Sequence, residues 1–346
     1  MQENFDFCSF AAANGYLGFK SYFREVFKPS ILSRLYILKG GPGTGKSSYM
    51  KKIFSVFKEK GYHCEAILCS SDPDSYDGVI VESEGGSIAI LDGTAPHTTD
   101  PTLPGAKEEI INLGDLWDSR FLKGRSEQIA ALTLEKGQAY KSAYKYLETS
   151  GSAASIVTDD LKERFDFRKA TRLAREIIPE TDHSRVLKTR LFSAFGKSGL
   201  LRLDTPKYIA KKVYRVTGEA RELFLTMLRD RAVNMSYGGI ASPSPLDPSI
   251  ADTLYLEESG ILYSCYEDGE VIDTDALIRK KSVGADEKAK AIREEALYEA
   301  ARRFKIAADL HARLETIYTA SMDFGKWNES YERVLGECEN ILSGKQ

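Results

Sequence analysis

Residues 40 to 47 read Gly40-Gly41-Pro42-Gly43-Thr44-Gly45-Lys46-Ser47, a complete G-x-x-x-x-G-K-[ST] pattern. An apolar run over 35–38 precedes it and a helical pattern over 47–60 follows it. We therefore expect a strand, a tight loop and a helix in that order. Glycines let the loop backbone curl so that successive N–H groups point at phosphate oxygens, and the helix N-terminus adds its positive dipole end. The stretch predicts a phosphate-binding loop.

Side chains in this loop have definite expected roles. Lys46 would reach the β- and γ-phosphates of a nucleoside triphosphate, and the Ser47 hydroxyl would ligate Mg²⁺. ATP and Mg²⁺ are the expected cofactors, although the motif itself leaves the choice between ATP and GTP open. The nucleotide-binding residues are expected to be Gly41, Pro42, Gly43, Thr44, Gly45, Lys46, Ser47 and Ser48.

A second metal-site residue is expected at the end of the apolar run over 88–91, which terminates in Asp92. A buried strand would place this carboxylate near the magnesium ion, where it orients the ion or a metal-bound water. The next residue is Gly93, where a motor-type ATPase would often carry a second acid. This glycine argues against strong motor-type ATP hydrolysis.

A polar loop over 69–78 leaves the carboxyl end of a predicted strand, where open α/β sheets bind ligands. It could hold a second substrate, a metal-bound water or a catalytic base, or it could be a turn-rich connector. Because Asp72 and Asp77 have counterparts later in the chain, we assign them a structural role. Asp74 is then the favoured catalytic acid, together with Ser70, Ser71 and Ser75.

His97 closes the segment that follows Asp92 and is expected beside the γ-phosphate. It could carry a proton or donate to transition-state oxygens, or it could simply hydrogen-bond within its loop. Thr94 in the same segment could sense the phosphate. An arginine is also expected to neutralise transition-state charge, and the candidates are Arg120, Arg125, Arg164, Arg168, Arg172 and Arg175.

The second half of the chain repeats parts of the first. Residues 213–218 match 35–40 at an offset of 178, and 247–257 match 72–82 at an offset of 175. The difference of three residues implies a deletion at the loop, where Glu222 replaces Ser47. A shortened loop with a carboxylate would not hold a triphosphate. We therefore expect duplicated domains, of which the second has lost nucleotide binding.

Each half also contains a long amphipathic stretch with apolar spacing near 3.6, over about 123–150 and 158–178 and again over 285–319 and 325–343. The expected fold is α/β, a duplicated P-loop NTPase fold in which each half has a parallel-sheet core and an appended long helical hairpin. The expected domains are 1–185, with its helical extension at about 123–180, and a degenerate domain 186–346, with its extension at about 285–343.

Composition limits the partners and the compartment. The chain has 346 residues and a net charge of −3, so no global basic character suggests nucleic acid or a membrane surface. No apolar run approaches the length of a membrane span, and the N-terminus lacks the basic region of a signal peptide. Five scattered cysteines indicate reduced thiols. A cytoplasmic protein is expected.

These motifs together resemble an uncharacterised family of tandem P-loop ATPases, some of which are loosely called ATPases or nucleotide kinases. The similarity covers the whole length but is concentrated in 5–120, and it implies ATP binding and two P-loop halves joined through helices. Many members keep a second loop, from which this chain departs at 217–222. The pieces that carry the resemblance are 38–47, 69–72, 74–80, 92–97, 100–101, 104–106 and 111–114.

Three functions are compatible with these features. The first is a Mg-dependent ATPase, a hydrolase with one active and one degenerate nucleotide site. The second is a kinase that transfers the γ-phosphoryl group to a small-molecule acceptor such as a nucleoside. The third is a nucleotide-controlled module that binds a protein partner through its helices and the degenerate half. The intact loop favours the first.

Overall fold

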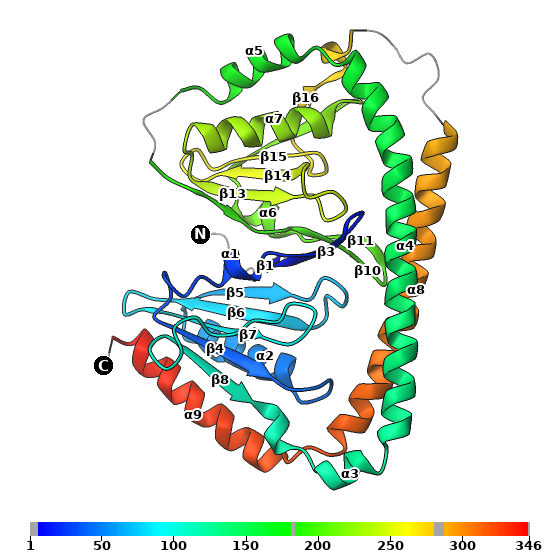
Figure 1. The fold of residues 1–346 in the computed structure, drawn as a ribbon. Coiled ribbons are helices and arrows are strands. Elements are labelled where there is room, and N and C mark those ends of the chain that lie inside the picture. The colour runs from blue at the N-terminus through cyan, green and yellow to red at the C-terminus, as the bar shows by residue number, and fades with distance from the viewer. Residues whose placement is uncertain (1–5, 181–183, 280–286, 345–346) are drawn as a thin grey trace. The chain divides into compact units, whose positions relative to one another are not determined.

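The computed structural model describes residues 6–180, 184–279 and 287–344 (Figure 1). The chain forms two compact units, each containing one six-stranded sheet. We call 6–12, 21–142 and 302–344 the N-sheet unit, and the described residues of 13–20 and 143–301 the C-sheet unit. The expected boundary at 185 separates the two sheets along the sequence, whereas both compact units are discontinuous.

The N-sheet has the strand order β1-β5-β6-β7-β4-β8. Strands β4, β7 and β8 are mutually parallel, as are β1 and β5, whereas β6 runs antiparallel to both of its neighbours. The strands are β1 (Phe7–Phe10), β4 (Arg34–Lys39), β5 (His63–Leu68), β6 (Tyr76–Glu82), β7 (Ser87–Asp92) and β8 (Glu108–Asn112).

The C-sheet has the equivalent order β9-β13-β14-β15-β12-β16, with the same strand directions. This equivalence supports the expected duplication. The strands are β9 (Leu187–Thr189), β12 (Lys212–Thr217), β13 (Gly239–Pro243), β14 (Ala251–Leu256), β15 (Ile261–Ser264) and β16 (Glu270–Asp273).

Both sheets are mixed, with one antiparallel strand in each, so the expected parallel-sheet cores are present only in part. The connections from β5 to β6 (69–75) and from β6 to β7 (83–86) are short, whereas a connection between parallel strands needs about a dozen residues. Strand β6 must therefore run antiparallel, and β14 repeats the arrangement. Each half also has a two-stranded hairpin, formed by β2 (Ala12–Gly15) with β3 (Gly18–Ser21) and by β10 (Ser193–Gly196) with β11 (Gly199–Arg202).

Helix α2 (Lys46–Glu59) follows β4 and buries Tyr49, Met50, Ile53, Phe54 and Phe57 in the core of the N-sheet unit. Their three- and four-residue spacing places them on one face of the helix. Helix α7 (Arg221–Asn234) is the equivalent in the C-sheet unit. The short helices are α1 (Phe23–Val26), η1 (Leu113–Leu116), α3 (Ser119–Lys123), α6 (Thr205–Ile209) and η2 (Asp275–Leu277).

The expected helical extensions are present as α4 (Ser126–Arg164), α5 (Phe167–Ile177), α8 (Glu287–Thr319) and α9 (Phe324–Leu342). The break expected between 150 and 158 is wrong, because α4 continues through this stretch. Residues 285 and 286, which were expected in the second extension, lie outside the described residues. No helix in the described ranges is both long enough and apolar enough to cross a membrane.

In each extension, the second helix belongs to the compact unit that contains the sheet of the other half. Helix α9 is part of the N-sheet unit, where the rings of Trp327 and Tyr331 each lie 5.3 Å from the ring of Tyr49 on α2. Helix α5 is part of the C-sheet unit, where Ala170 and Ala174 join the same core cluster as Phe224 of α7. The expectation that each hairpin is appended to its own half is therefore wrong for these two helices.

Candidate functional site

The loop over 40–47 connects β4 to α2 and is sharply curled. The φ angles of Gly40, Gly43 and Gly45 are 155°, 70° and 82°, and glycine adopts such positive values at little cost. The buried Thr44 side chain donates from Oγ1 to the carbonyl oxygen of Gly41 at 2.9 Å. No side chain caps the first turn of α2. The first-turn N–H groups therefore remain suited to an anion.

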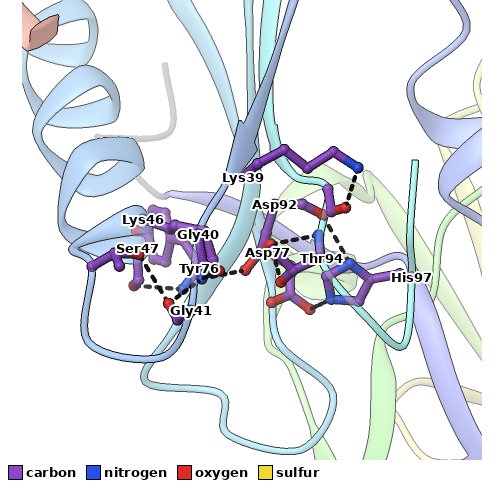
Figure 2. Close-up of polar contacts among 12 residues, drawn as sticks. Lys39, Gly40, Gly41, Lys46, Ser47, Tyr76, Asp77, Asp92, Thr94 and His97 are labelled. Atoms are coloured by element: carbon purple, nitrogen blue, oxygen red, sulfur yellow. Dashed lines mark hydrogen bonds and ion pairs between the residues drawn. The ribbon is translucent and has the colours of Figure 1, made fainter. Parts of the chain in front are cut away.

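Lys46 lies between this loop and the end of β7 (Figure 2). Its ammonium donates to the carbonyl oxygens of Gly40 and Gly41, each at 2.9 Å. The same nitrogen lies 3.7 Å from Oδ2 of Asp92, and both side chains are largely buried. The structure therefore brings together the expected loop lysine and the expected strand-end aspartate.

Asp92 is held in one orientation by Thr94. Its Oδ1 accepts hydrogen bonds from the Thr94 backbone N–H at 2.9 Å and from the Thr94 hydroxyl at 2.6 Å. Because β7 pairs directly with β4, Asp92 lies opposite Leu38, close to the start of the loop. Thr94 therefore orients the carboxylate, and Oδ2 faces Lys46.

Ser47 connects the first turn of α2 to β6. Its hydroxyl oxygen accepts a hydrogen bond from the Tyr76 N–H at 2.9 Å, which uses one of its two lone pairs. The other lone pair can serve a metal ion. Ser48, the last residue expected in the nucleotide site, is exposed.

The donor set fits Mg²⁺ bound together with a triphosphate. Mg²⁺ commonly uses one or two protein oxygens and completes its shell with phosphate oxygens and water, and here Ser47 Oγ and Asp92 Oδ2 could supply the protein oxygens. Over the part of the chain that the structure describes, no three or more His, Cys, Asp or Glu side chains cluster in a way suited to a metal ion.

His97 and Asp77 form a buried pair behind Asp92. The His97 ring stacks on Phe23 with centroids 4.3 Å apart, and Nδ1 lies 2.9 Å from the Asp92 carbonyl oxygen, to which it can donate. Its Nε2 lies 3.6 Å from Asp77 Oδ2. This burial favours the alternative in which His97 hydrogen-bonds within its own loop.

Asp77, which the sequence analysis assigned to structure, is closer to the site than the favoured acid Asp74. Burial raises the pKa of Asp77 to about 6, the negative charge of Asp92 adds to the increase, and His97 opposes it. Asp74 is exposed, and its backbone carbonyl accepts a hydrogen bond from Lys51. The position of Asp77 on a strand beside β7 was the signal that could have identified it.

Two further features of the loop after β7 were not predicted. Lys39 donates to the carbonyl oxygens of Gly93 and Thr99 at 2.8 and 2.7 Å, and thereby fixes this loop against β4. A Cβ on Gly93 would overlap Cγ2 of Ile37. The absence of a second acid at this position therefore has a steric reason.

Helices α8 and α9 pack directly on the glycine loop. The Thr319 hydroxyl donates to the Gly43 carbonyl oxygen at 3.0 Å, and a Cβ on Gly43 would overlap the carbonyl oxygen of Glu315. A Cβ on Gly45 would lie 2.8 Å from Nε1 of Trp327. The loop glycines therefore permit close helix packing in addition to the curled backbone, which the motif alone does not indicate.

Two of the six candidate arginines have contacts outside the glycine loop. The guanidinium of Arg125 lies 3.6 Å from the ring centroid of Phe121, and Arg164 pairs with Asp160 and Glu219. Arg120 is in the N-sheet unit, whereas Arg168, Arg172 and Arg175 belong to the C-sheet unit.

The equivalent position in the C-sheet unit lacks the features of a phosphate site. The Glu219 N–H donates to Asp275 Oδ1 at 3.0 Å, so a loop amide is already bonded to a carboxylate. Continuing the strand register places Cys265 where the first half has Asp92. Glu222 stands in the first turn of α7. These three differences extend the sequence argument that the second loop is degenerate.

Comparisons of this chain with protein-family models, with curated proteins and with solved structures found no match.

Proposed function

We propose that this chain binds a Mg²⁺-complexed nucleoside triphosphate, most consistently ATP, at Gly40–Ser47 and hydrolyses it slowly. The observation that carries the proposal is the position of Lys46, beside both the curled loop and Asp92 and at an α2 N-terminus without a side-chain cap. This combination offers backbone donors and a cation to the phosphates, and two oxygens to the metal ion bound with them.

Each residue has a separate role in this proposal. The loop amides and Lys46 hold the phosphates, while Ser47 and Asp92 hold Mg²⁺. When bound, the ion neutralises phosphate charge and orients the terminal phosphoryl group. Thr94 positions Asp92 through its two hydrogen bonds.

Slow turnover is proposed because the position after Asp92 is a glycine and not an acid. Any side chain at Gly93 would overlap Ile37, so the carboxylate that polarises an attacking water in many ATPases has no place there. The matching strand orders of the two sheets support our proposal that the chain is a tandem P-loop ATPase with one degenerate half.

Calorimetric titration with Mg·ATP tests the proposal. Wild-type protein should bind one ATP per chain, and Lys46→Ala should abolish or strongly weaken binding. Lys28→Ala, which changes an exposed lysine of the same unit, is the matched control and should bind like the wild type. The proposal is wrong if the wild type does not bind or if Lys46→Ala binds as tightly as the control.

One observation also favours a nucleotide-controlled binding module. Gly43 of the loop accepts a hydrogen bond from Thr319 at the end of α8, so a phosphate bound by the loop could alter the packing of that helix. Hydrogen exchange over 302–342 with and without Mg·ATP tests this function. Identical protection in both states would exclude it.

A further inference from the structure

Lys136 of α4 lies in a small cluster of titratable side chains beside the glycine loop. Its ammonium is 3.4 Å from Nδ1 of His311 on α8. Nε2 of His311 is in turn 3.6 Å from Oε1 of Glu315, one turn further along the same helix. All three residues belong to the N-sheet unit.

Helix packing fixes this cluster relative to the loop. Leu132, one turn before Lys136, is buried in a cluster with Leu310 and Leu314, which flank His311 and Glu315 in the sequence. The backbone of α8 at Glu315 in turn contacts Gly43. The helices that carry Lys136 and His311 therefore pack against each other, and α8 also packs against the loop at Glu315.

The charges of the cluster are poorly balanced. Burial lowers the pKa of Lys136, with Lys46 adding to the decrease and Glu315 opposing it. No carboxylate lies within salt-bridge distance of Lys136 over the described residues. The positive charge of Lys46, which itself lies 3.7 Å from Asp92 Oδ2, thus acts on Lys136. An anion bound between the two ammonium groups would relieve their repulsion.

His311 is suited to hold Lys136 in its charged form. Burial lowers the pKa of His311 to about 4, with Lys136 and Lys46 adding to the decrease and Asp72 and Asp92 opposing it. The imidazole is therefore neutral at pH 7. With its proton on Nε2, facing Glu315, its Nδ1 accepts a hydrogen bond from the Lys136 ammonium.

We propose that Lys136 is the second phosphate-contacting cation of this site, donating to the terminal phosphate of a triphosphate held by Gly40–Ser47, and that His311 positions it. This inference rests on the proposed function. In phosphoryl-transfer enzymes an arginine often neutralises charge at the terminal phosphate. Here we assign that role to a lysine on α4.

The test compares the affinities for ATP and ADP by calorimetry in the presence of Mg²⁺. Lys136→Met should weaken ATP binding about 10- to 100-fold, as expected for loss of a hydrogen bond to a charged group, while ADP affinity changes less than about twofold. Lys141→Met, which changes an exposed lysine on the same helix, is the matched control and should leave both affinities unchanged.

The role of His311 is tested by a double-mutant cycle. If His311 acts through Lys136, His311→Ala should reduce the preference for ATP over ADP, and adding His311→Ala to Lys136→Met should have no further effect. A purely structural role would lower both affinities together and would add to the Lys136 effect. Lys136→Arg should retain most of the preference.

The outcomes separate this inference from the proposed function. If the wild type binds neither nucleotide, the proposed function fails. If it binds both and Lys136→Met has the same ATP-to-ADP ratio as Lys141→Met, only the role of Lys136 is refuted. Should Lys136→Met lose its native circular dichroism spectrum, the ratio measured for Lys136→Gln decides in its place.

Discussion

Replacing Trp327 tests whether α9 is part of the N-sheet unit. The side chain is 4% exposed. It stacks on Tyr331 with a centroid distance of 5.8 Å and meets the ring of Tyr49 edge-on at 5.3 Å. Its Nε1 is buried without a hydrogen-bond partner, so its removal loses packing and no hydrogen bond. Trp327→Ala therefore isolates the packing contribution of α9.

The expected loss follows from this burial. Truncation of a buried tryptophan to alanine costs about 3–5 kcal/mol of unfolding free energy. Lys52 lies 4.9 Å from the indole centroid, and loss of that cation–π contact adds about 0.5–1 kcal/mol. For a unit of this size, about 2–4 °C of melting temperature per kcal/mol gives a decrease of roughly 7–24 °C for the sum of the two contributions.

Thermal unfolding measures the size of the effect, and hydrogen exchange measures its location. Amides of α2 should lose protection in Trp327→Ala, whereas those of β12 to β16 should not. Phe324→Ala removes a 46% exposed aromatic from the same helix and should cost less than about 1 kcal/mol. Equal losses of unfolding free energy in the two variants, or a loss of amide protection confined to the C-sheet, would refute the assignment of α9 to the N-sheet unit.

Three further predictions concern the loop and its surroundings. Gly43→Ala should lower the calorimetric ATP affinity at least about tenfold, because a Cβ at φ 70° would overlap the Glu315 carbonyl oxygen. The control is Gly61→Ala, at φ 81° in open space. It should cost about 1–2 kcal/mol of unfolding free energy and leave the ATP affinity unchanged. The pKa of Asp77 is raised from 3.8 to about 6, so the contribution of this carboxyl to stability falls as pH rises from about 3.8 to 6. The unfolding free energy of Asp77→Asn, measured in urea, should therefore rise relative to wild type by up to about 3 kcal/mol between pH 3.5 and 7. A difference that does not change with pH would contradict this. Asp92→Asn should reduce the enhancement of ATP affinity by Mg²⁺ about 10- to 100-fold, and an unchanged enhancement in magnesium titrations would exclude Asp92 from the metal site.

The features that the sequence predicted well are local ones. The strand, curled loop and helix around Gly40–Ser47 follow from glycine spacing and from the apolar residues on either side. Asp92 could be placed because a short apolar strand ends at that residue. The repeat was detectable because matching strands occupy matching positions, and the two sheets indeed have the same strand order.

The features that the sequence did not predict depend on which elements meet in space. An amphipathic pattern gives the buried face of α9 but not the sheet against which that face packs. Lys136 could not be identified from the sequence either, because its partner His311 is far away in the chain and no motif connects the two residues. Asp77 was assigned a structural role because Asp252 occupies the equivalent position in the second half. Burial nevertheless raises the pKa of both carboxyls to about 6.

A structure determined with Mg²⁺ and a non-hydrolysable ATP analogue tests the central claim most directly. The account predicts density for the triphosphate within Gly40–Ser47, with Mg²⁺ beside Ser47 and Asp92, and none at Gly218–Glu222. Density at the second loop, or an unoccupied first loop at saturating analogue, would contradict it.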